Sequence, residues 1–269
     1  MTAFLQIVGQ IQRPVVNLTR QIPSFIYATA SIDRLMELET SPKEETGEQQ
    51  MVSGTAGIRL RDLTFRYEDG DRDILSGLNF EFAPGSRTAI VGETGIGKST
   101  LVRLILSVLR PTGGRIEIYG EGECFEASPR TRCNLVYVPQ GNTLLSGTIR
   151  DNLRLGDPDA SEKRMRWALM VSEAGFVFDL PDGLDTVCGE KGAGLSEGQA
   201  QRIAIARGLL RPGSILLMDE FSSSLDPDTE ARLVENLSRS AEGKTIIFIS
   251  HRERVVAGCD HVLNLEELS

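Results

Sequence analysis

A glycine-rich segment at residues 92–100 constrains the fold of this chain more than any other feature. Two glycines separated by four residues are followed by Lys and Ser, which is the phosphate-loop pattern. An apolar run at residues 88–91 precedes the segment and an amphipathic run at residues 101–109 follows it. This order predicts a strand, a loop and a helix, the setting that the pattern needs. The segment consists of Gly92, Glu93, Thr94, Gly95, Ile96, Gly97, Lys98, Ser99 and Thr100.

The residue types of this segment suit a nucleoside triphosphate. Glycines let the backbone curl until successive N–H groups point at a phosphate oxygen, and the helix adds its positive N-terminal end. Lys98 supplies a point charge for the terminal phosphates, and the Ser99 hydroxyl is placed to bind Mg²⁺. A flexible surface loop, the alternative interpretation, would not need the flanking strand and helix.

The composition of the chain limits the molecules with which it can interact and the compartment in which it works. The formal net charge is −9 and the pI is near 5.0, which disfavours nucleic acid as a partner. The cysteines show no paired metal spacing and indicate reduced thiols in a cytosolic compartment. No apolar run is long enough to cross a bilayer, so a membrane-spanning partner would lie outside this sequence. The cysteines are Cys124, Cys133, Cys188 and Cys259.

The chain divides into three parts by composition. In the first part, residues 1–40, helical spacing extends over residues 3–39, and Pro14 and Pro23 are expected to kink or interrupt that helix. By itself this pattern fits either an amphipathic helix packed on the main domain or the cytoplasmic end of a membrane helix. Residues 41–57 are polar and rich in helix breakers, which predicts a linker. Residues 58–269 form the compact domain.

Strands that alternate with helices predict an α/β fold with a mostly parallel, covered sheet. The first two strands and their turn indicate a separate antiparallel β subdomain, and a long helical region indicates an α-helical subdomain. Strands are expected at residues 58–67, 78–82, 115–119, 135–138, 215–218, 245–249 and 261–265, and helical structure dominates residues 148–210.

Two further motifs surround the phosphate loop. The apolar strand at residues 215–218 ends in Asp219 and Glu220, where Asp219 is placed to hold the Mg²⁺ shell and Glu220 to orient water. A solvated acidic turn is the alternative. Residues 195–199, Leu-Ser-Glu-Gly-Gln, begin a long helical run, and a helix start offers a hydroxyl and free amides to an anion. Ser196 could also be an ordinary helix cap.

The pentapeptide at residues 195–199, lying between the phosphate loop and the acidic strand, resembles the signature of ATP-binding cassette proteins. Tyr67 resembles the aromatic residue of this family that stacks on adenine. Gln140 resembles the glutamine of its Q-loop, which approaches the metal and the attacking water. Residues 223–226, ending in Asp226, resemble the D-loop, and His251 resembles the switch histidine at the γ-phosphate. The resemblance covers residues 58–265.

Finer features resemble the exporter branch of the family. Residues 144–153 resemble the segment that follows the Q-loop in exporters. Residues 189–192, including Glu190, resemble the X-loop, which meets the membrane domain. Residues 12–35 look like the cytoplasmic end of the last transmembrane helix, so the resemblance favours the second interpretation of residues 1–40.

Two residues depart from the family pattern. Glu197 stands where the signature usually has glycine, and an acid near a phosphate would repel it unless the side chain points away. The expected cost is slightly weaker ATP-driven pairing. Phe221, after Glu220, is bulky where the family usually has a small residue, and the sequence offers no reason for it.

The resemblance implies ATP and Mg²⁺ as cofactors and a head-to-tail pair of cassettes, the simplest being a homodimer. It implies an ATPase that drives export at the cytoplasmic face of the cell membrane, together with a transmembrane domain. The implied residues are Lys98, Gln140, Glu220 and His251 for catalysis; Ser99, Gln140 and Asp219 for the metal; and Tyr67, residues 92–100, Ser196, Gly198, Gln199 and Asp226 for ATP.

Other functional classes fit the sequence less well. Relatives that act on DNA carry a long coiled-coil insertion, relatives that act in translation carry two cassettes in one chain, and this sequence has neither. An inactive cassette would not need Lys98, Asp219, Glu220 and His251 together. A phosphate-loop kinase or GTPase would lack the signature and the switch histidine.

Overall fold

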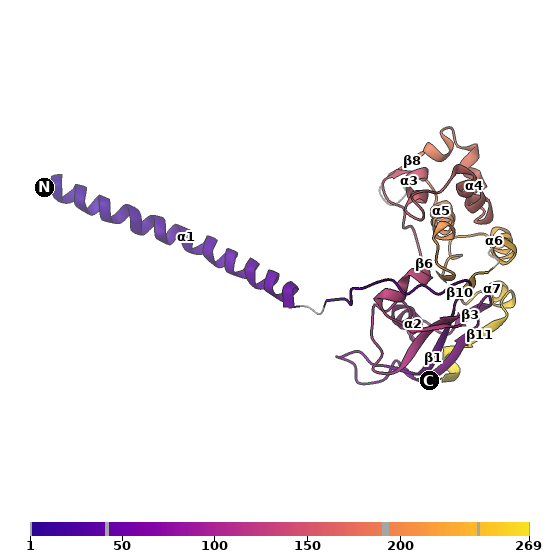
Figure 1. Ribbon diagram of the computed structural model, residues 1–269. Helices are drawn as coiled ribbons and strands as arrows, with labels where there is room; N and C mark the ends of the chain where they lie inside the picture. Colours follow the sequence, from indigo (N-terminus) through magenta and orange to yellow (C-terminus); the bar gives the residue numbers. More distant parts are fainter. Residues whose placement is uncertain (1, 41–42, 190–193, 241–242, 269) are drawn as a thin grey trace. The chain divides into compact units, whose positions relative to one another are not determined.

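A parallel sheet carries the phosphate loop at the centre of the larger of two units. The computed structural model describes all residues except 1, 41–42, 190–193, 241–242 and 269, and the chain divides into residues 1–44 and 45–269. In the described part of the larger unit, the sheet has five strands in the order β11-β3-β10-β9-β6 (Figure 1). The strands are β3 (Arg87–Val91), β6 (Leu135–Val138), β9 (Ile215–Asp219), β10 (Thr245–Ile249) and β11 (His261–Asn264).

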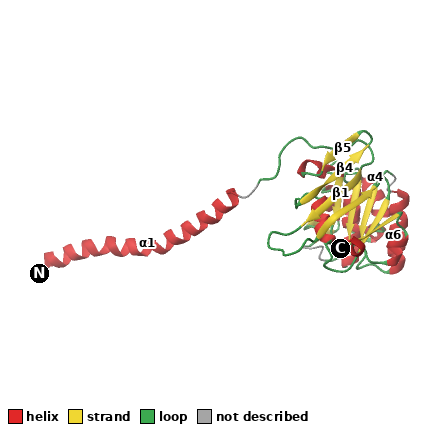
Figure 2. Ribbon diagram, turned by 90° about the horizontal axis from the view of Figure 1, so that it is seen from below, coloured by secondary structure: helices red, strands yellow, loops and turns green. Residues whose placement is uncertain are grey.

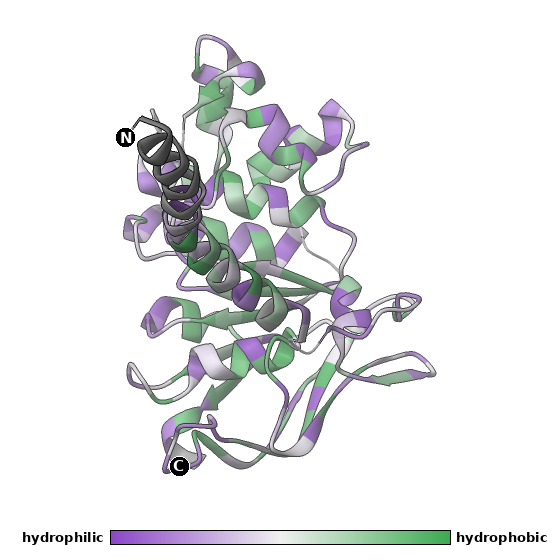
Figure 3. Cartoon of the chain, turned by 90° about the vertical axis from the view of Figure 1, so that its left-hand side faces the viewer, coloured by the Kyte–Doolittle hydropathy of each residue, from purple (hydrophilic) through white to green (hydrophobic). Residues whose placement is uncertain are grey.

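The parallel sheet separates two hydrophobic cores, and residues alternate between them along each strand. In β9, Leu216 and Met218 belong to one core, whereas Ile215 and Leu217 belong to the other. Helix α2 (Lys98–Ile105) packs into the second core, and α5 (Glu197–Leu210) packs into the first. Because both faces are covered, the strands are nearly continuous apolar runs, and hydrophobic colouring follows them in Figure 3.

An antiparallel sheet packs into the same core as α2. Its strand order is β2-β1-β4-β5, with β1 paired to both β2 and β4 (Figure 2). Buried residues alternate with more exposed ones along parts of β1 and β2, and the alternation is interrupted where their register shifts. The strands are β1 (Gly57–Phe65), β2 (Leu75–Phe82), β4 (Gly113–Gly120) and β5 (Glu123–Glu126).

Helices α3, α4 and α5 gather on the other side of the unit (Figure 1). The remaining helices are α3 (Ile149–Arg154), α4 (Glu162–Val171), α6 (Pro227–Ser240) and α7 (Glu253–Ala257). The short pair β7 (Gly147–Thr148) and β8 (Val187–Cys188) joins this region, and 3₁₀ turns lie at η1 (Pro129–Asn134), η2 (Gly175–Asp179), η3 (Gly183–Asp185) and η5 (Leu265–Leu268). The predicted fold class, with its three structural parts, is confirmed, and all four cysteines are free thiols.

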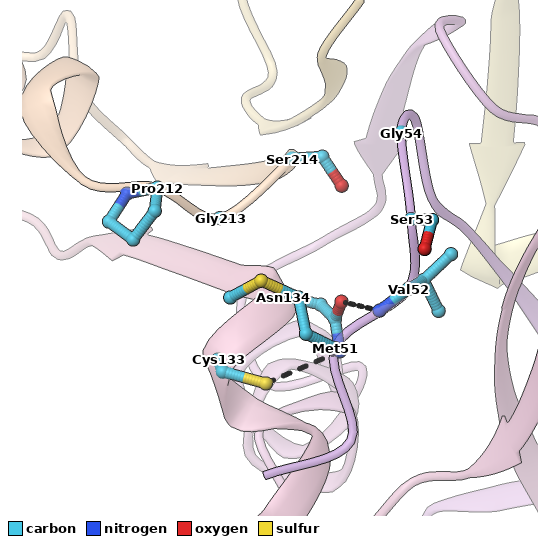
Figure 4. A pocket seen from close by; sticks show the side chains of 9 residues that line it. All are labelled: Met51, Val52, Ser53, Gly54, Cys133, Asn134, Pro212, Gly213 and Ser214. Carbon is cyan, nitrogen blue, oxygen red and sulfur yellow. Dashed lines mark hydrogen bonds between the residues drawn. The ribbon is translucent and has the colours of Figure 1, made fainter.

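The structure differs from the sequence-based division at the start of the compact unit. Val52 and Ala56, assigned to the linker, are buried in the core. Asn134 holds this segment through its side chain, accepting the Val52 N–H at 2.8 Å and donating to the Gln50 carbonyl at 2.7 Å. A cavity of about 350 Å³ lies between residues 51–54, η1 and the loop before β9 (Figure 4). Polar composition identified a linker, but these tertiary hydrogen bonds attach its second half to the domain.

Helix α1 (Thr2–Thr40) is a unit of its own and runs without a break through Pro14 and Pro23. The expected interruption is therefore wrong, although the helix is curved along its length (Figure 2). A proline removes one backbone hydrogen bond and crowds the preceding turn, which a helix can absorb by bending. Among the described residues, no helix combines the length and the apolar character needed to cross a bilayer.

Candidate functional site

One edge of the parallel sheet collects predicted site residues from four neighbouring strands. β3, β10, β9 and β6 are adjacent and parallel, so their carboxyl ends lie together. The phosphate loop follows β3, and Asp219 ends β9 opposite Ile249 of β10. His251 and Gln140 each come two residues after the end of their strand. The topology thus unites groups that are far apart in the sequence.

The phosphate loop turns tightly between β3 and α2. Gly97 has a φ of 117°, and a Cβ at this position would lie 2.9 Å from the Ile74 side chain, so glycine is required for two reasons. Lys98 Nζ donates to the carbonyls of Gly92 and Glu93, the latter at 2.9 Å. α2 begins without a side-chain cap. Its first N–H groups are therefore available to an anion.

Tyr67 lies beside the phosphate-loop helix. Its hydroxyl is 3.2 Å from the Thr100 Oγ1, and its ring meets Phe65 edge-on with centroids 4.9 Å apart. The side chain keeps 37% of its surface exposed. The Tyr67 ring is thus fixed by its hydroxyl and by its contact with Phe65. Its free face is suited to stack on a planar base.

Asp219 is half-buried at the end of β9. Burial raises the pKa of this carboxyl above its usual value, and the Tyr137 hydroxyl and the Lys98 ammonium act in the opposite direction. The Tyr137 hydroxyl donates to Asp219 Oδ2 at 3.1 Å. A half-buried carboxylate near a cationic side chain is a suitable ligand for a divalent cation.

Glu220 is held in an uncommon backbone conformation. Its φ is 40°, which costs a non-glycine residue about 1–3 kcal/mol, and its N–H donates to the Ile249 carbonyl at 3.0 Å. Gln140 Nε2 donates to Glu220 Oε2 at 2.8 Å. The structure thus brings together the predicted Q-loop glutamine and the predicted catalytic acid. Such strain is found where the surrounding structure fixes a functional side chain.

The signature serine both caps α5 and stays accessible. Ser196 Oγ accepts the Gln199 N–H at 3.2 Å, and Gln199 Oε1 accepts the Ser196 N–H at 2.9 Å. Ser196 and Glu197 are exposed, while Gly198 is buried. A Cβ on Gly198 would lie 2.8 Å from the Ser224 carbonyl oxygen, so α5 can approach the D-loop only with glycine there. The Ser196 hydroxyl retains its own proton for donation to an acceptor outside the capping box.

The D-loop and the segment after β10 are tied together by Arg252. Its guanidinium donates to the Ser223 carbonyl at 3.2 Å and to the Leu225 carbonyl at 3.4 Å, and it pairs with buried Glu230 at 3.2 Å. The exposed side chain of Asp226 caps α6 by accepting the Thr229 N–H at 3.0 Å. Exposed His251 lies immediately before Arg252.

The structure describes one of the two segments that resemble the exporter branch and leaves most of the other outside the described residues. Within residues 144–153, Thr148 caps α3 by accepting the Asp151 N–H at 3.0 Å, which stabilises the start of that helix. Residues 190–193, which include Glu190 and most of the expected X-loop, lie outside the described residues.

The bulky residue after Glu220 has a structural explanation. Phe221 is fully buried, and its ring lies 5.2 Å from that of Phe248 at an angle of 38°. Both rings belong to the core that contains α5. Phe221 therefore fills the interior behind the acidic pair and does not compete for the site.

We expect Phe221→Ala to lower the free energy of unfolding by about 3–5 kcal/mol, because it removes buried area and leaves a cavity. Urea unfolding measures this loss. Phe221→Leu, which retains most of the volume, should cost under about 1.5 kcal/mol. A loss below about 1 kcal/mol for the alanine variant would contradict the packing role.

The residues present fit a magnesium ion that is shared with a nucleotide. Among the described residues, no group of three His, Cys, Asp or Glu side chains could hold a metal. Mg²⁺ is commonly held by one or two protein oxygens together with substrate phosphates and water. Asp219 and the exposed Ser99 hydroxyl are oxygen donors of this kind, the first from β9 and the second from the first turn of α2.

Sequence reasoning missed Tyr137 and Arg252. A phenol in an apolar strand, three residues before Gln140, was a usable signal, since a buried tyrosine hydroxyl needs a partner. The partner itself depends on which strand lies next to β6. Arg252 gave no signal beyond its place after His251, and its D-loop contacts are purely tertiary.

Comparisons with known proteins identify the family of this chain. A family described as "ABC transporter" matches residues 75–223, more than half of the chain. The leukotoxin translocation ATP-binding proteins LktB of Mannheimia haemolytica and Mannheimia glucosida are each 34% identical over 269 residues, 99% of this chain and 38% of theirs. A bacterial Atm1-family ABC exporter solved with ATP bound is 35% identical with a TM-score of 0.78, covering 91% of this chain and 43% of that one. The chain spans less than half the length of these relatives.

Proposed function

The chain belongs to the ABC transporter family as an ATP-binding, ATP-hydrolysing domain, and we propose that it powers export across a membrane by pairing head to tail with a second cassette. The observation that carries the proposal is the meeting of Lys98, Asp219 and Glu220 at one sheet edge, with the Ser196 hydroxyl exposed elsewhere on the same molecule. One cassette offers one copy of each half-site. Each ATP would then need the signature of a partner.

The roles proposed for the residues follow from their chemistry. Lys98 and the first amides of α2 hold the phosphates, and Tyr67 stacks on the adenine. Glu220 orients the attacking water and accepts its proton, and His251 stabilises the γ-phosphate. The partner's signature helix contributes the amide of Gly198 and the hydroxyl of Ser196. Gln199 keeps that hydroxyl in place through the capping box.

Magnesium is proposed as the cofactor that accompanies ATP. Ser99 and Asp219 would hold it, with Gln140 beside them, and it would neutralise charge that develops on the phosphates. Gln140 donates to Glu220 in this structure. Because this amide contacts the proposed catalytic acid, a movement of Glu220 would alter the position of Gln140 and of the Q-loop that starts there.

Membrane coupling is proposed from the relatives, which are more than twice as long as this chain. Residues 1–40, which contain helix α1 (Thr2–Thr40), would be the cytoplasmic end of the last transmembrane helix, and residues 58–269 the nucleotide-binding domain. The unit would then work at the cytoplasmic face of the cell membrane. Its partners would be a second copy of the cassette and a transmembrane domain, with no nucleic acid.

Mixing two inactive variants tests the head-to-tail site. Lys98→Ala damages the phosphate loop, whereas Ser196→Asp keeps a good helix cap but repels phosphate. Each variant alone should be inactive. An equimolar mixture should recover at most about a quarter of the normal ATPase rate, since half of the dimers are mixed and each has one intact site of two.

The matched control mixes Lys98→Ala with Glu220→Gln. Both changes damage the same half of the site, so no mixed dimer has an intact site and no activity should return. Recovery in the control, or its absence in the test mixture, would contradict the arrangement. A phosphate-release assay measures both.

A further inference from the structure

Tyr137 contacts the acid to which the proposed function assigns the metal. We propose that Tyr137 is a positioning residue for Asp219: its hydroxyl engages one carboxylate oxygen and leaves the other free for the divalent cation that accompanies the nucleotide. The inference rests on the proposed function and deepens it, by assigning a residue that controls the strength of metal binding.

The sheet places these two side chains on the same face. β6 and β9 pair in parallel, with Tyr137 opposite Leu217. Leu217 and Ile215 point into the core that contains α2, and Tyr137 packs against that core as well. Asp219 follows Leu217 by two residues and so emerges on the same face. This is the side of the sheet covered by the phosphate-loop helix, which carries Lys98 and Ser99.

The hydrogen bond joins two half-buried groups. The Tyr137 hydroxyl lies 3.1 Å from Asp219 Oδ2. A phenol hydroxyl is a hydrogen-bond donor to a carboxylate oxygen. A donor to one oxygen restricts rotation of the carboxylate, and outer-shell partners of this kind commonly strengthen metal binding by 10–100-fold.

An ordinary structural role is the competing interpretation. Tyr137 could simply be a core aromatic whose hydroxyl is satisfied by the nearest acceptor. That role predicts that its loss affects stability, or nucleotide binding in general. A positioning role predicts a loss confined to conditions in which a divalent cation is present.

The test is Tyr137→Phe in the full chain, with the non-hydrolysable ATP analogue AMP-PNP as the probe. Calorimetry would give its dissociation constant in excess Mg²⁺ and in EDTA. We expect the variant to bind about tenfold more weakly in Mg²⁺ and equally well in EDTA. The Mg²⁺ concentration for half-maximal ATPase activity should rise by about the same factor.

Tyr119→Phe is the matched control. The Tyr119 hydroxyl also donates to a carboxylate, that of Glu81 at 2.5 Å. Its partner lies on the antiparallel sheet and not at the nucleotide edge. This variant removes the same kind of hydrogen bond and should leave both dissociation constants unchanged.

A second variant separates position from packing. In an Asp219→Asn background, Tyr137→Phe should cause no further loss of binding in Mg²⁺, because the carboxylate through which it acts is gone. Unchanged binding of Tyr137→Phe in Mg²⁺, or an equal loss in Mg²⁺ and EDTA, would overturn the positioning role alone. Failure of the unmodified chain to bind AMP-PNP in either condition would overturn the proposed function as well.

Discussion

Replacing Glu220 with Gln should slow ATP hydrolysis by about 100-fold or more while leaving ATP affinity within about twofold. The amide has the same shape and still offers an oxygen to Gln140 Nε2, so the local structure should persist. It has no basicity with which to accept a proton from water. Single-turnover phosphate release gives the rate, and calorimetry gives the affinity.

The same variant should accumulate as a dimer when ATP is present, because the closed pair forms but is not opened by hydrolysis. Size-exclusion chromatography with and without ATP measures this shift. Glu235→Gln, an exposed acid on α6, serves as the control and should behave like the unmodified chain. Near-normal turnover in the Glu220 variant would remove this residue from its catalytic role.

Replacing Lys98 with Ala should weaken ATP binding by about 10–100-fold, since hydrogen bonds to charged groups are worth about 1.5–3 kcal/mol each. In this structure the ammonium group lies over the loop carbonyls of Gly92 and Glu93, where the phosphates are expected. A fluorescent ATP analogue, titrated at constant Mg²⁺, measures the change.

Lys163→Ala, which removes an exposed lysine from α4, is the matched control and should leave the affinity unchanged. The thermal midpoint of both variants checks that the fold is intact, since Lys98 also stabilises its own loop. An unaltered dissociation constant in the Lys98 variant would place the phosphates elsewhere.

The two variants should separate binding from chemistry. The Lys98 variant is expected to lose affinity and, with it, ATP-dependent pairing, whereas the Glu220 variant should keep affinity and pair more stably. If both variants instead lost ATP affinity equally, Lys98 and Glu220 would both support the structure of the site. The proposed separation between a binding residue and a catalytic residue would then be wrong.

The periodicity of apolar residues predicted much of the fold, because the burial of strands and helices produces a regular apolar pattern in the sequence. β6 and β10 begin and end where the sequence analysis placed them. β10 lies inside the sheet and β6 lies at the end of its described strand order, and nearly every position in both strands is apolar. Boundaries were less exact in the antiparallel sheet, where β2 begins at Leu75 and not at residue 78. Ser76 and Gly77, which are exposed, separate Leu75 from the rest of the apolar pattern.

Predictions based on composition alone were less successful. The prolines of α1 did not end the helix, and residues 50–56 proved to belong to the compact unit. In α1 the continuing helix outweighed the local preference of proline. In residues 50–56 distant partners such as Asn134 outweighed the polar composition. Phe221 likewise became intelligible only through Phe248, which comes from another strand.

The sequence alone determined which chemical groups are available to bind phosphate and metal. It places glycines where the backbone must curl, a lysine and a serine after them, and two acids at the end of an apolar strand. Each of these features depends on residues that are neighbours in the sequence, so it can be recognised without the structure. The tertiary structure decided which side chains meet. Tyr137 donates to Asp219, Gln140 donates to Glu220, and Arg252 ties the D-loop to the segment after β10. Such contacts depend on strand order and register, which arise only when the whole chain packs.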